Sequence, residues 1–480
     1  MSLALSETKE VDKMFQDGLI YQDSYMCSEE EFVKGMSSFQ LSSKGNEAFG
    51  KGGGPVLFRQ GDTVYTDPGD AHSLYVGDTG SMKTLRFILP LIYSSAMAEE
   101  SMVIVDPKGE LARKTHQFLR DKGYEVNVLN LRHPQDSPDK WNPFSEADKL
   151  YKSGPDGRRA APILLSDFCH QIFFSKAEKR RDPYWNESAG QLALGLLELI
   201  QASGEDLTMK NLLNWRYVKL PDGTVEECFQ KLDSNSEVYQ NLAGYMSLTA
   251  DTTQSCILSS FDQLVRIFKL STDLTDLLST TTFDISQIGE KKKAVFLIVP
   301  DEKTTLHVLA TLFIQQCYTT LLDKAEEYEG RLPKRVNFIL EEFCNMPKLS
   351  DLVAMLTAAR SRNIRFHLVI QSYGQVVDKY GENVSKTILD NCGNLIYLHT
   401  REISFLEYIS KLAGRNEYGR PLLSPSRLQR LKKNETLIFH DRCYPFLTQD
   451  IPLIFEYPIE LGKTLPKRKK AYLKRKKMSN

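Results

Sequence analysis

Residues 77–84 have the residue types and the spacing of a phosphate-binding loop. The pattern G-x-x-x-x-G-K-[ST] is met by Gly77, Lys83 and Thr84, while Met82 stands where the pattern has its second glycine. Backbone N–H groups at such a turn converge on phosphate oxygens. Lys83 would reach the β- and γ-phosphates of a nucleoside triphosphate, and Thr84 would hold Mg²⁺. The residues predicted to surround the ligand are Gly77, Asp78, Thr79, Gly80, Ser81, Met82, Lys83 and Thr84.

Met82 is the one mismatch to this pattern. If the missing glycine has a positive φ, methionine there costs about 1–2 kcal/mol, which a folded scaffold can absorb. The alternative interpretation of the segment is a glycine-rich turn before a helix, with no ligand. The substitution also leaves open whether a bound nucleotide is hydrolysed.

Two carboxylates follow a strand-like apolar run. Glu341 and Glu342 come directly after Val336–Leu340, and the carboxyl ends of parallel strands meet at the ligand-binding edge of a sheet. Glu341 could bind Mg²⁺ through water, and Glu342 could polarise an attacking water. Gln371 follows the next strand-like run and could sense the γ-phosphate. A solvated acidic loop and an ordinary strand cap are the alternatives.

Two basic features have two interpretations each. Arg360 lies in a short arginine-rich segment, 359–362, and an arginine supplied across a subunit boundary can stabilise transition-state charge. From these residues alone, a solvated helix end, where cations are favoured, is the preferred interpretation. The run Lys467–Lys477 could bind nucleic acid, a membrane surface or an acidic partner through counterion release. It could also be a solubilising tail.

Composition narrows the class of protein. The chain has 480 residues, 41% hydrophobic and 26% charged, which is ordinary for a globular protein of two or three domains. A net charge of −1 argues against a uniformly basic DNA-coating protein. The eight cysteines form no C-x-x-C pair, so we expect reduced thiols and neither disulfides nor a zinc site. The longest apolar stretch, 85–98, is too short for a membrane span, and we expect a soluble, cytoplasmic chain.

Apolar strands alternate with helical segments, which is typical of an α/β fold with a mainly parallel sheet. The alternation stops after residue 144, and helical spacing without strand-like runs continues to about residue 285. We therefore expect an all-helical insert in the α/β domain. The predicted strands are 55–58, 63–65, 74–76, 102–105, 125–129, 294–299, 336–340, 366–370 and 394–397, with an edge hairpin of 435–439 and 445–447.

Taken together, these segments resemble the TraG/TraD family of conjugation coupling proteins, the ATPases of type IV secretion. The resemblance covers about residues 60–450. It rests on the motifs His72, Val105–Leu111, Trp141–Phe144, Asp182–Trp185, Ile298–Lys303, the Glu-Glu-Phe343 strand end, Ala359–Arg362 and Ile370–Ser372, in this order.

The resemblance implies a RecA-like P-loop motor domain of residues 56–150 and 286–455, with an inserted all-α domain of 151–285. A polar N-terminal segment, 1–55, and a basic C-terminal tail, 456–480, flank it. The resemblance further implies a hexameric ring that hydrolyses ATP with Mg²⁺. Its partners would be DNA, a relaxase and secretion-channel proteins. Carried over by motif, Lys83 and Thr84 bind phosphate and Mg²⁺, Glu341 takes the metal-side role, Glu342 and Gln371 act on the attacking water and the γ-phosphate, and Arg360 reaches the neighbouring subunit.

The sequence departs from this family at three points. Met82 replaces a glycine, Glu341 replaces the usual aspartate, and the two N-terminal membrane helices of the family are not found. The first two departures suggest a catalytically impaired, nucleotide-binding adaptor as the alternative to a motor. The third suggests a soluble branch held at the inner face of the membrane by partners, or a shortened chain. A ring translocase of the chromosome-segregation or DNA-packaging type is a further alternative.

Overall fold

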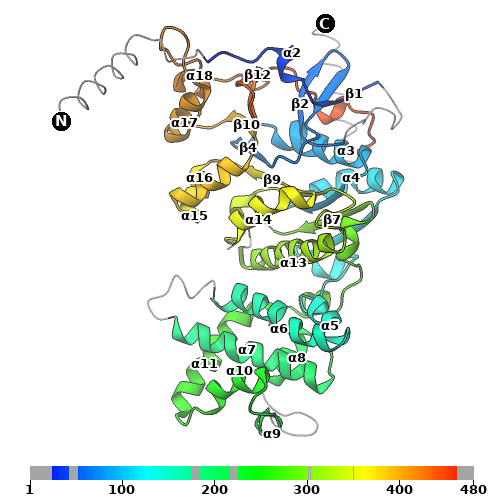
Figure 1. The fold of residues 1–480 in the computed structure, drawn as a ribbon, viewed down its shortest axis with the longest axis vertical. Helices are drawn as coiled ribbons and strands as arrows, with labels where there is room; N and C mark the ends of the chain where they lie inside the picture. The colour runs from blue at the N-terminus through cyan, green and yellow to red at the C-terminus, as the bar shows by residue number, and fades with distance from the viewer. Residues whose placement is uncertain are drawn as a thin grey trace, which may run out of the picture.

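The computed structural model of the chain describes residues 24–42, 52–174, 183–216, 225–269, 271–300, 302, 304–349 and 351–461. Its strands (Figure 1) are β1 (Ser37–Gln40), β2 (Val56–Gln60), β3 (Thr63–Thr66), β4 (Ser73–Gly77), β5 (Ser101–Val105), β6 (Glu125–Asn130), β7 (Lys293–Ile298), β8 (Val336–Leu340), β9 (Ile364–Ile370), β10 (Asn394–His399), β11 (Thr436–His440) and β12 (Phe446–Thr448). The α-helices are α2 (Glu29–Phe32), α3 (Leu89–Met97), α4 (Glu110–Asp121), α5 (Ser145–Lys152), α6 (Pro155–Cys169), α7 (Tyr184–Ser203), α8 (Met209–Trp215), α9 (Val225–Gln230), α10 (Glu237–Met246), α11 (Asp251–Val265), α12 (Thr272–Leu277), α13 (His307–Glu326), α14 (Leu352–Ala359), α15 (Gly374–Tyr380), α16 (Glu382–Asn391), α17 (Ile403–Ala413) and α18 (Pro425–Gln429).

The central sheet has nine strands in the order β12-β11-β10-β4-β9-β8-β5-β7-β6. The seven strands from β10 to β6 are parallel, and β11 and β12 add an antiparallel hairpin at one edge. Alternate residues of each strand enter opposite faces, so Leu74 and Val76 of β4 lie in one apolar core and Tyr75 in the other. Both faces are therefore buried. The predicted α/β class with a mainly parallel sheet is confirmed.

Some predicted elements differ in detail. The helix expected over 83–99 begins as a π-helical turn, Thr84–Ile88, and continues as α3. Pro90 lies in the first turn of α3 and has no N–H to donate to the turn before it, so that turn does not close as an α-helix. The helix expected over 349–362 is α14 followed by a 3₁₀ turn, Arg360–Arg362. The short helix α15 and the strand β1 were not predicted.

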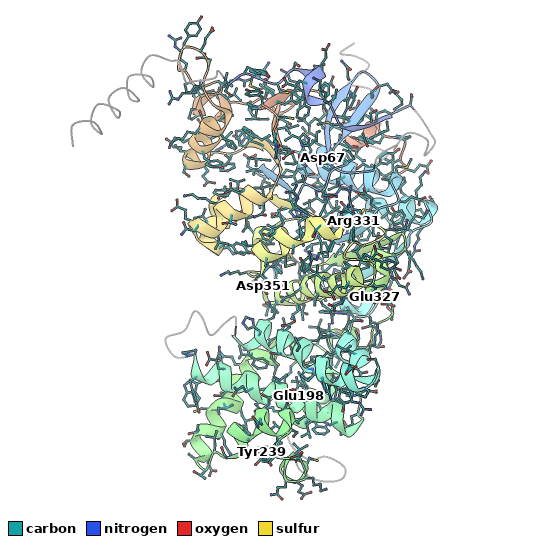
Figure 2. The ribbon with its side chains drawn as sticks, viewed as in Figure 1. Asp67, Glu198, Tyr239, Glu327, Arg331 and Asp351 are labelled. Atoms are coloured by element: carbon teal, nitrogen blue, oxygen red, sulfur yellow. The ribbon has the colours of Figure 1, made fainter. Side chains whose placement is uncertain are left out.

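Between β6 and β7, the residues that the structure describes form helices and no strand. Figure 1 shows α5–α11 gathered at one end of the long axis, away from the sheet, and Figure 2 places Glu198 and Tyr239 among them. The helical region joins the core of the sheet at Trp141, whose ring meets Phe313 of α13 edge-on at 5.1 Å and whose Nε1 donates to Gln316. Helices begin already at Ser145. The division of the chain into domains stays a prediction.

The N-terminal region contributes an antiparallel sheet of β1, β3 and β2. None of the helices that the structure describes combines the length and the apolar character needed to cross a bilayer. The basic run Lys467–Lys477 lies outside the described residues.

His72 is a buried, neutral histidine just before β4. Its Nε2 lies 2.7 Å from the carbonyl oxygen of Leu356, and its Nδ1 accepts from the N–H of Phe366 at 3.0 Å. Burial lowers the pKa of His72 to about 4, and the positive charges of Arg360 and Arg365 act in the same direction. The side chain therefore joins β4, α14 and β9 only while it carries a single proton.

We expect His72 to make the fold acid-sensitive. In the unfolded chain His72 has the ordinary histidine pKa of about 6.5, so between pH 6.5 and 4 it is protonated there but neutral in the folded chain. Because the unfolded state binds more protons in this range, the free energy of unfolding falls as the pH falls. The loss is about 3 kcal/mol at pH 4. Urea unfolding of the wild type and of His72→Gln between pH 4.5 and 7.5 measures it. The variant should have the flatter pH dependence, and equal slopes would contradict the prediction.

Candidate active site

The loop of residues 77–84 connects β4 to the helix of residues 84–97 at the carboxyl edge of the sheet. Gly80 has φ +87°, and a Cβ there would meet no atom within 4 Å, so the loop opens toward free space at this point. Met82 has φ +67°. The residue that replaces the motif glycine is thus held in the left-handed region, at the cost of about 1–2 kcal/mol that such a conformation carries for an L-residue.

Lys83 is turned back onto its own loop. Its Nζ donates to the carbonyl oxygens of Gly77 and Asp78. Burial lowers the pKa of Lys83, while the carboxylates of Glu342, Asp78 and Glu341 oppose the shift. Lys83 thus lies near carboxylates, but its ammonium group donates to two backbone carbonyl oxygens of its own loop.

Thr84 and Glu341 meet, as their predicted roles require. The Thr84 hydroxyl donates to Glu341 Oε1 at 2.8 Å, although 257 residues separate the two in sequence. Glu341 is only 8% exposed, and burial raises the pKa of its carboxyl to about 7, with the charges of Asp106, Glu110 and Glu342 adding to the shift. Burial and the neighbouring carboxylates thus favour the protonated form of Glu341.

Glu342 and Gln371 form a second pair beside the loop. Gln371 Nε2 donates to both oxygens of Glu342, at 3.1 and 2.8 Å, and its Oε1 accepts from the Thr79 hydroxyl at 3.3 Å. Gln371 thereby bridges the loop of residues 77–84 and the carboxylate of Glu342. It can do so because β9 lies between β4 and β8 in the sheet.

Two neighbours of the loop have roles that we did not predict. His399, at the end of β10, places Nδ1 2.9 Å from Asp78 Oδ2, and the N–H of Asp78 donates to the carbonyl of His399. Asp106, after β5, is fully buried and accepts from the N–H groups of Glu110 and Ala112 at the start of α4. Burial raises the pKa of Asp106 to about 6. The signal was available for both, because each is a polar residue at or just after the end of a parallel strand.

Arg360 is the one predicted site residue that a single chain does not bring to this edge. It precedes β9, whereas Gln371 follows it. The seven residues of β9 separate the two by roughly 20 Å at about 3.3 Å per residue. Arg360 is exposed at the opposite edge of the sheet, near His72.

The family described as type IV secretory system conjugative DNA transfer matches residues 16–416 of the chain. The chain belongs to this family. The resemblance found in the motifs is therefore confirmed.

Individual curated proteins are similar to the chain along most of its length. The chain is 21% identical over 430 residues to the probable conjugal transfer protein TraG of Sinorhizobium fredii, covering 82% of this chain and 63% of that protein. It is 24% identical to the type IV secretion system-coupling protein VirD4 of Bartonella quintana, covering 79% and 58%. The chain thus spans less than two thirds of the length of these curated relatives.

The fold has a close counterpart among solved structures. The plasmid coupling protein TrwB in complex with a non-hydrolysable ATP analogue superposes with a TM-score of 0.65 at 16% identity, covering 93% of this chain and 96% of that one. A second structure of TrwB, in complex with ADP and Mg²⁺, gives a TM-score of 0.62 at 16% identity, covering 90% and 94%. At this identity the likeness establishes the shared fold, with its P-loop sheet and its helices.

Proposed function

We propose that this chain is the nucleotide-driven motor subunit of a conjugative or type IV secretion apparatus, which binds ATP with Mg²⁺ and uses hydrolysis to move DNA. The observation that carries the proposal is the convergence at one sheet edge of Thr84 with Glu341 and of Gln371 with Glu342 and Thr79. Family membership and the names of the relatives, among them coupling and conjugal transfer proteins, support the same assignment.

The residues at this edge fit a magnesium nucleotide. Thr84 and Glu341 offer a hydroxyl and a carboxylate oxygen 2.8 Å apart, and Mg²⁺ in nucleotide sites takes few protein oxygens besides phosphates and water. In the described part of the chain, no cluster of three or more acidic, histidine or cysteine side chains forms a separate metal cage. A cation beside Glu341 would also compensate the buried carboxylate, which otherwise tends to hold a proton. TrwB, with the same fold, has been solved with ADP and Mg²⁺.

Each side chain has a defined task in this proposal. When bound, ATP with Mg²⁺ supplies the activated phosphoryl group. Lys83 releases the carbonyls of Gly77 and Asp78 and donates to phosphate oxygens instead. Glu342 accepts a proton from the attacking water, and Gln371 holds that carboxylate in place. Because Gln371 also accepts from the Thr79 hydroxyl, it links the position of Glu342 to the loop of residues 77–84.

Assembly into a ring, which we propose to be a hexamer, would complete the site. Arg360 lies too far from Gln371 to serve its own subunit, so its role as a transition-state cation requires a neighbour to present it. The cargo would be DNA bound to a relaxase, and the secretion-channel proteins would be further partners. We place this work in the cytoplasm, at the inner face of the membrane.

Lys83→Ala tests the motor. We expect DNA-stimulated ATP hydrolysis to fall by about 10²- to 10³-fold, because the variant loses a preorganised donor to the phosphates. The matched control is Lys386→Ala, which removes an exposed lysine of α16 that pairs with Glu382 four residues earlier. Wild-type turnover equal to that of Lys83→Ala would contradict the motor.

A nucleotide-binding adaptor is the second candidate. Two observations favour it: Met82 holds a strained φ of +67°, and Lys83 is engaged by loop carbonyls. An adaptor would bind a fluorescent ATP analogue in a Lys83-dependent manner without turning it over. Binding without hydrolysis in the wild type would therefore replace the motor with this function.

A further inference from the structure

The loop that follows Glu342 has an unusual backbone. Glu342 has φ +53°, in the left-handed region where a non-glycine residue persists only if its surroundings impose it. Its carbonyl accepts from the N–H of Asn345 at 2.8 Å, which closes a 3₁₀ turn over Phe343–Asn345. The direction of the Glu342 side chain thus depends on what holds this turn.

Side chains from two helices contact three successive carbonyls of the loop. Lys379 of α15 donates through Nζ to the carbonyls of Cys344 and Met346. Between these two, the carbonyl oxygen of Asn345 lies 2.6 Å from Nδ1 of His307, the first residue of α13. Two side chains thus contact three consecutive backbone oxygens of this loop.

Both helices are tied to the edge of the sheet where Glu342 acts. α15 begins three residues after Gln371, the partner of Glu342. Tyr380, next to Lys379, stacks on Phe343 with ring centroids 5.9 Å apart, and its hydroxyl accepts from the N–H of Leu349 at 3.1 Å. α15 therefore holds both ends of the loop as well as its middle.

His307 connects the same loop to the end of another strand. Its Nε2 lies 2.7 Å from the carbonyl oxygen of Pro300, two residues after β7. The residue is 3% exposed; its contact with Pro300 is buried and its contact with Asn345 is partly buried. The loops after β7 and β8 thus both contact one imidazole.

We propose that Lys379 and His307 are positioning residues, which clamp the carbonyls of residues 344–346 so that the Glu342 carboxylate faces Gln371. The clamp deepens the proposed function, since it rests on Glu342 acting on the attacking water. The physical reason is that a general base must lie within hydrogen-bonding reach of the proton it accepts, and an error of about 1 Å can cost a hundredfold in rate. Neither side chain touches the nucleotide in this proposal.

Lys379→Met tests the clamp, with Lys379→Arg as the rescue. Methionine keeps the length of the side chain but donates no hydrogen bond, whereas arginine still donates to two carbonyls. We expect kcat for ATP to fall by about 10- to 100-fold in Lys379→Met, with KM unchanged and with most of the rate restored in Lys379→Arg. Lys386→Met, on the exposed face of α16, is the matched control.

Hydrogen exchange separates the clamp from the chemistry. In Lys379→Met, the amides of Asn345 and Leu349 should exchange faster, while those of strand β8 keep their protection. If the wild type hydrolyses no ATP, the proposed role of Glu342 fails, and the exchange rates alone decide the clamp. The clamp would be overturned if the amides of Asn345 and Leu349 exchanged in Lys379→Met at the wild-type rate. It would also be overturned if the wild type hydrolysed ATP and Lys379→Met had the same kcat.

Discussion

Replacing Glu342 with glutamine should lower the rate of ATP hydrolysis by about 10²- to 10⁴-fold and leave nucleotide affinity nearly unchanged. The amide cannot take a proton from water, so the contribution of a general base is lost. It is isosteric with the carboxylate and can still accept from Gln371, whose Nε2 lies 2.8 Å from the nearer carboxylate oxygen. Single-turnover hydrolysis and equilibrium binding of a non-hydrolysable analogue measure the two effects separately.

The control for this experiment is Glu382→Gln, which neutralises an exposed carboxylate at the start of α16. It should hydrolyse ATP at the wild-type rate. Glu342→Gln with more than half of the wild-type rate would remove Glu342 from the chemistry. If Glu342→Gln lost nucleotide binding as well as the hydrolysis rate, Glu342 would instead have a role in the conformation of the nucleotide-binding loop.

The second large effect concerns stability and the opposite edge of the sheet. Arg365 of β9 is fully buried, and its guanidinium donates to Glu100 Oε2 at 2.5 Å and to Asn337 at 2.9 Å. It also donates to the carbonyls of Gly53, Asp67 and Gly69. Glu100 is 5% exposed and accepts in addition from the N–H of Gly53 at 3.1 Å. The pair thus fastens the segment before β2 to the sheet.

We expect Glu100→Ala to lower the free energy of unfolding by about 3–5 kcal/mol, because it leaves the Arg365 charge buried without its partner. Urea denaturation followed by circular dichroism measures the loss. Glu382→Ala breaks an exposed pair between residues four apart and should cost no more than about 0.5 kcal/mol. A similar small cost for Glu100→Ala would mean that water or the carboxylates of Asp67 and Asp70, which favour the charged form of Arg365, compensate its charge.

Local patterns in the sequence were sufficient for much of the fold and of the site. Apolar runs bounded by polar residues place β4, β5, β8 and β9 within two residues of their observed ends, because strands buried on both faces are nearly continuous in hydrophobicity. The loop of residues 77–84 is contiguous, so residue spacing alone predicts that it binds phosphate. Glu341, Glu342 and Gln371 could be predicted because parallel strands deliver their carboxyl ends to one edge.

The order of the strands and the contacts between distant segments were decided by the tertiary structure alone. Nothing in residues 336–342 indicates that β9 separates β8 from β4, yet this order is what lets Gln371 bridge Thr79 and Glu342. His399 beside Asp78 and His307 beside Asn345 are long-range pairs of the same kind. A local sequence pattern indicates which face of a strand or helix is buried. Which other element packs against that face depends on the packing of the whole chain. The sequence by itself therefore determined most of the elements, the candidate phosphate-binding loop and the sheet edge where the candidate site lies. Only the folded chain determined which side chains meet there and what holds them.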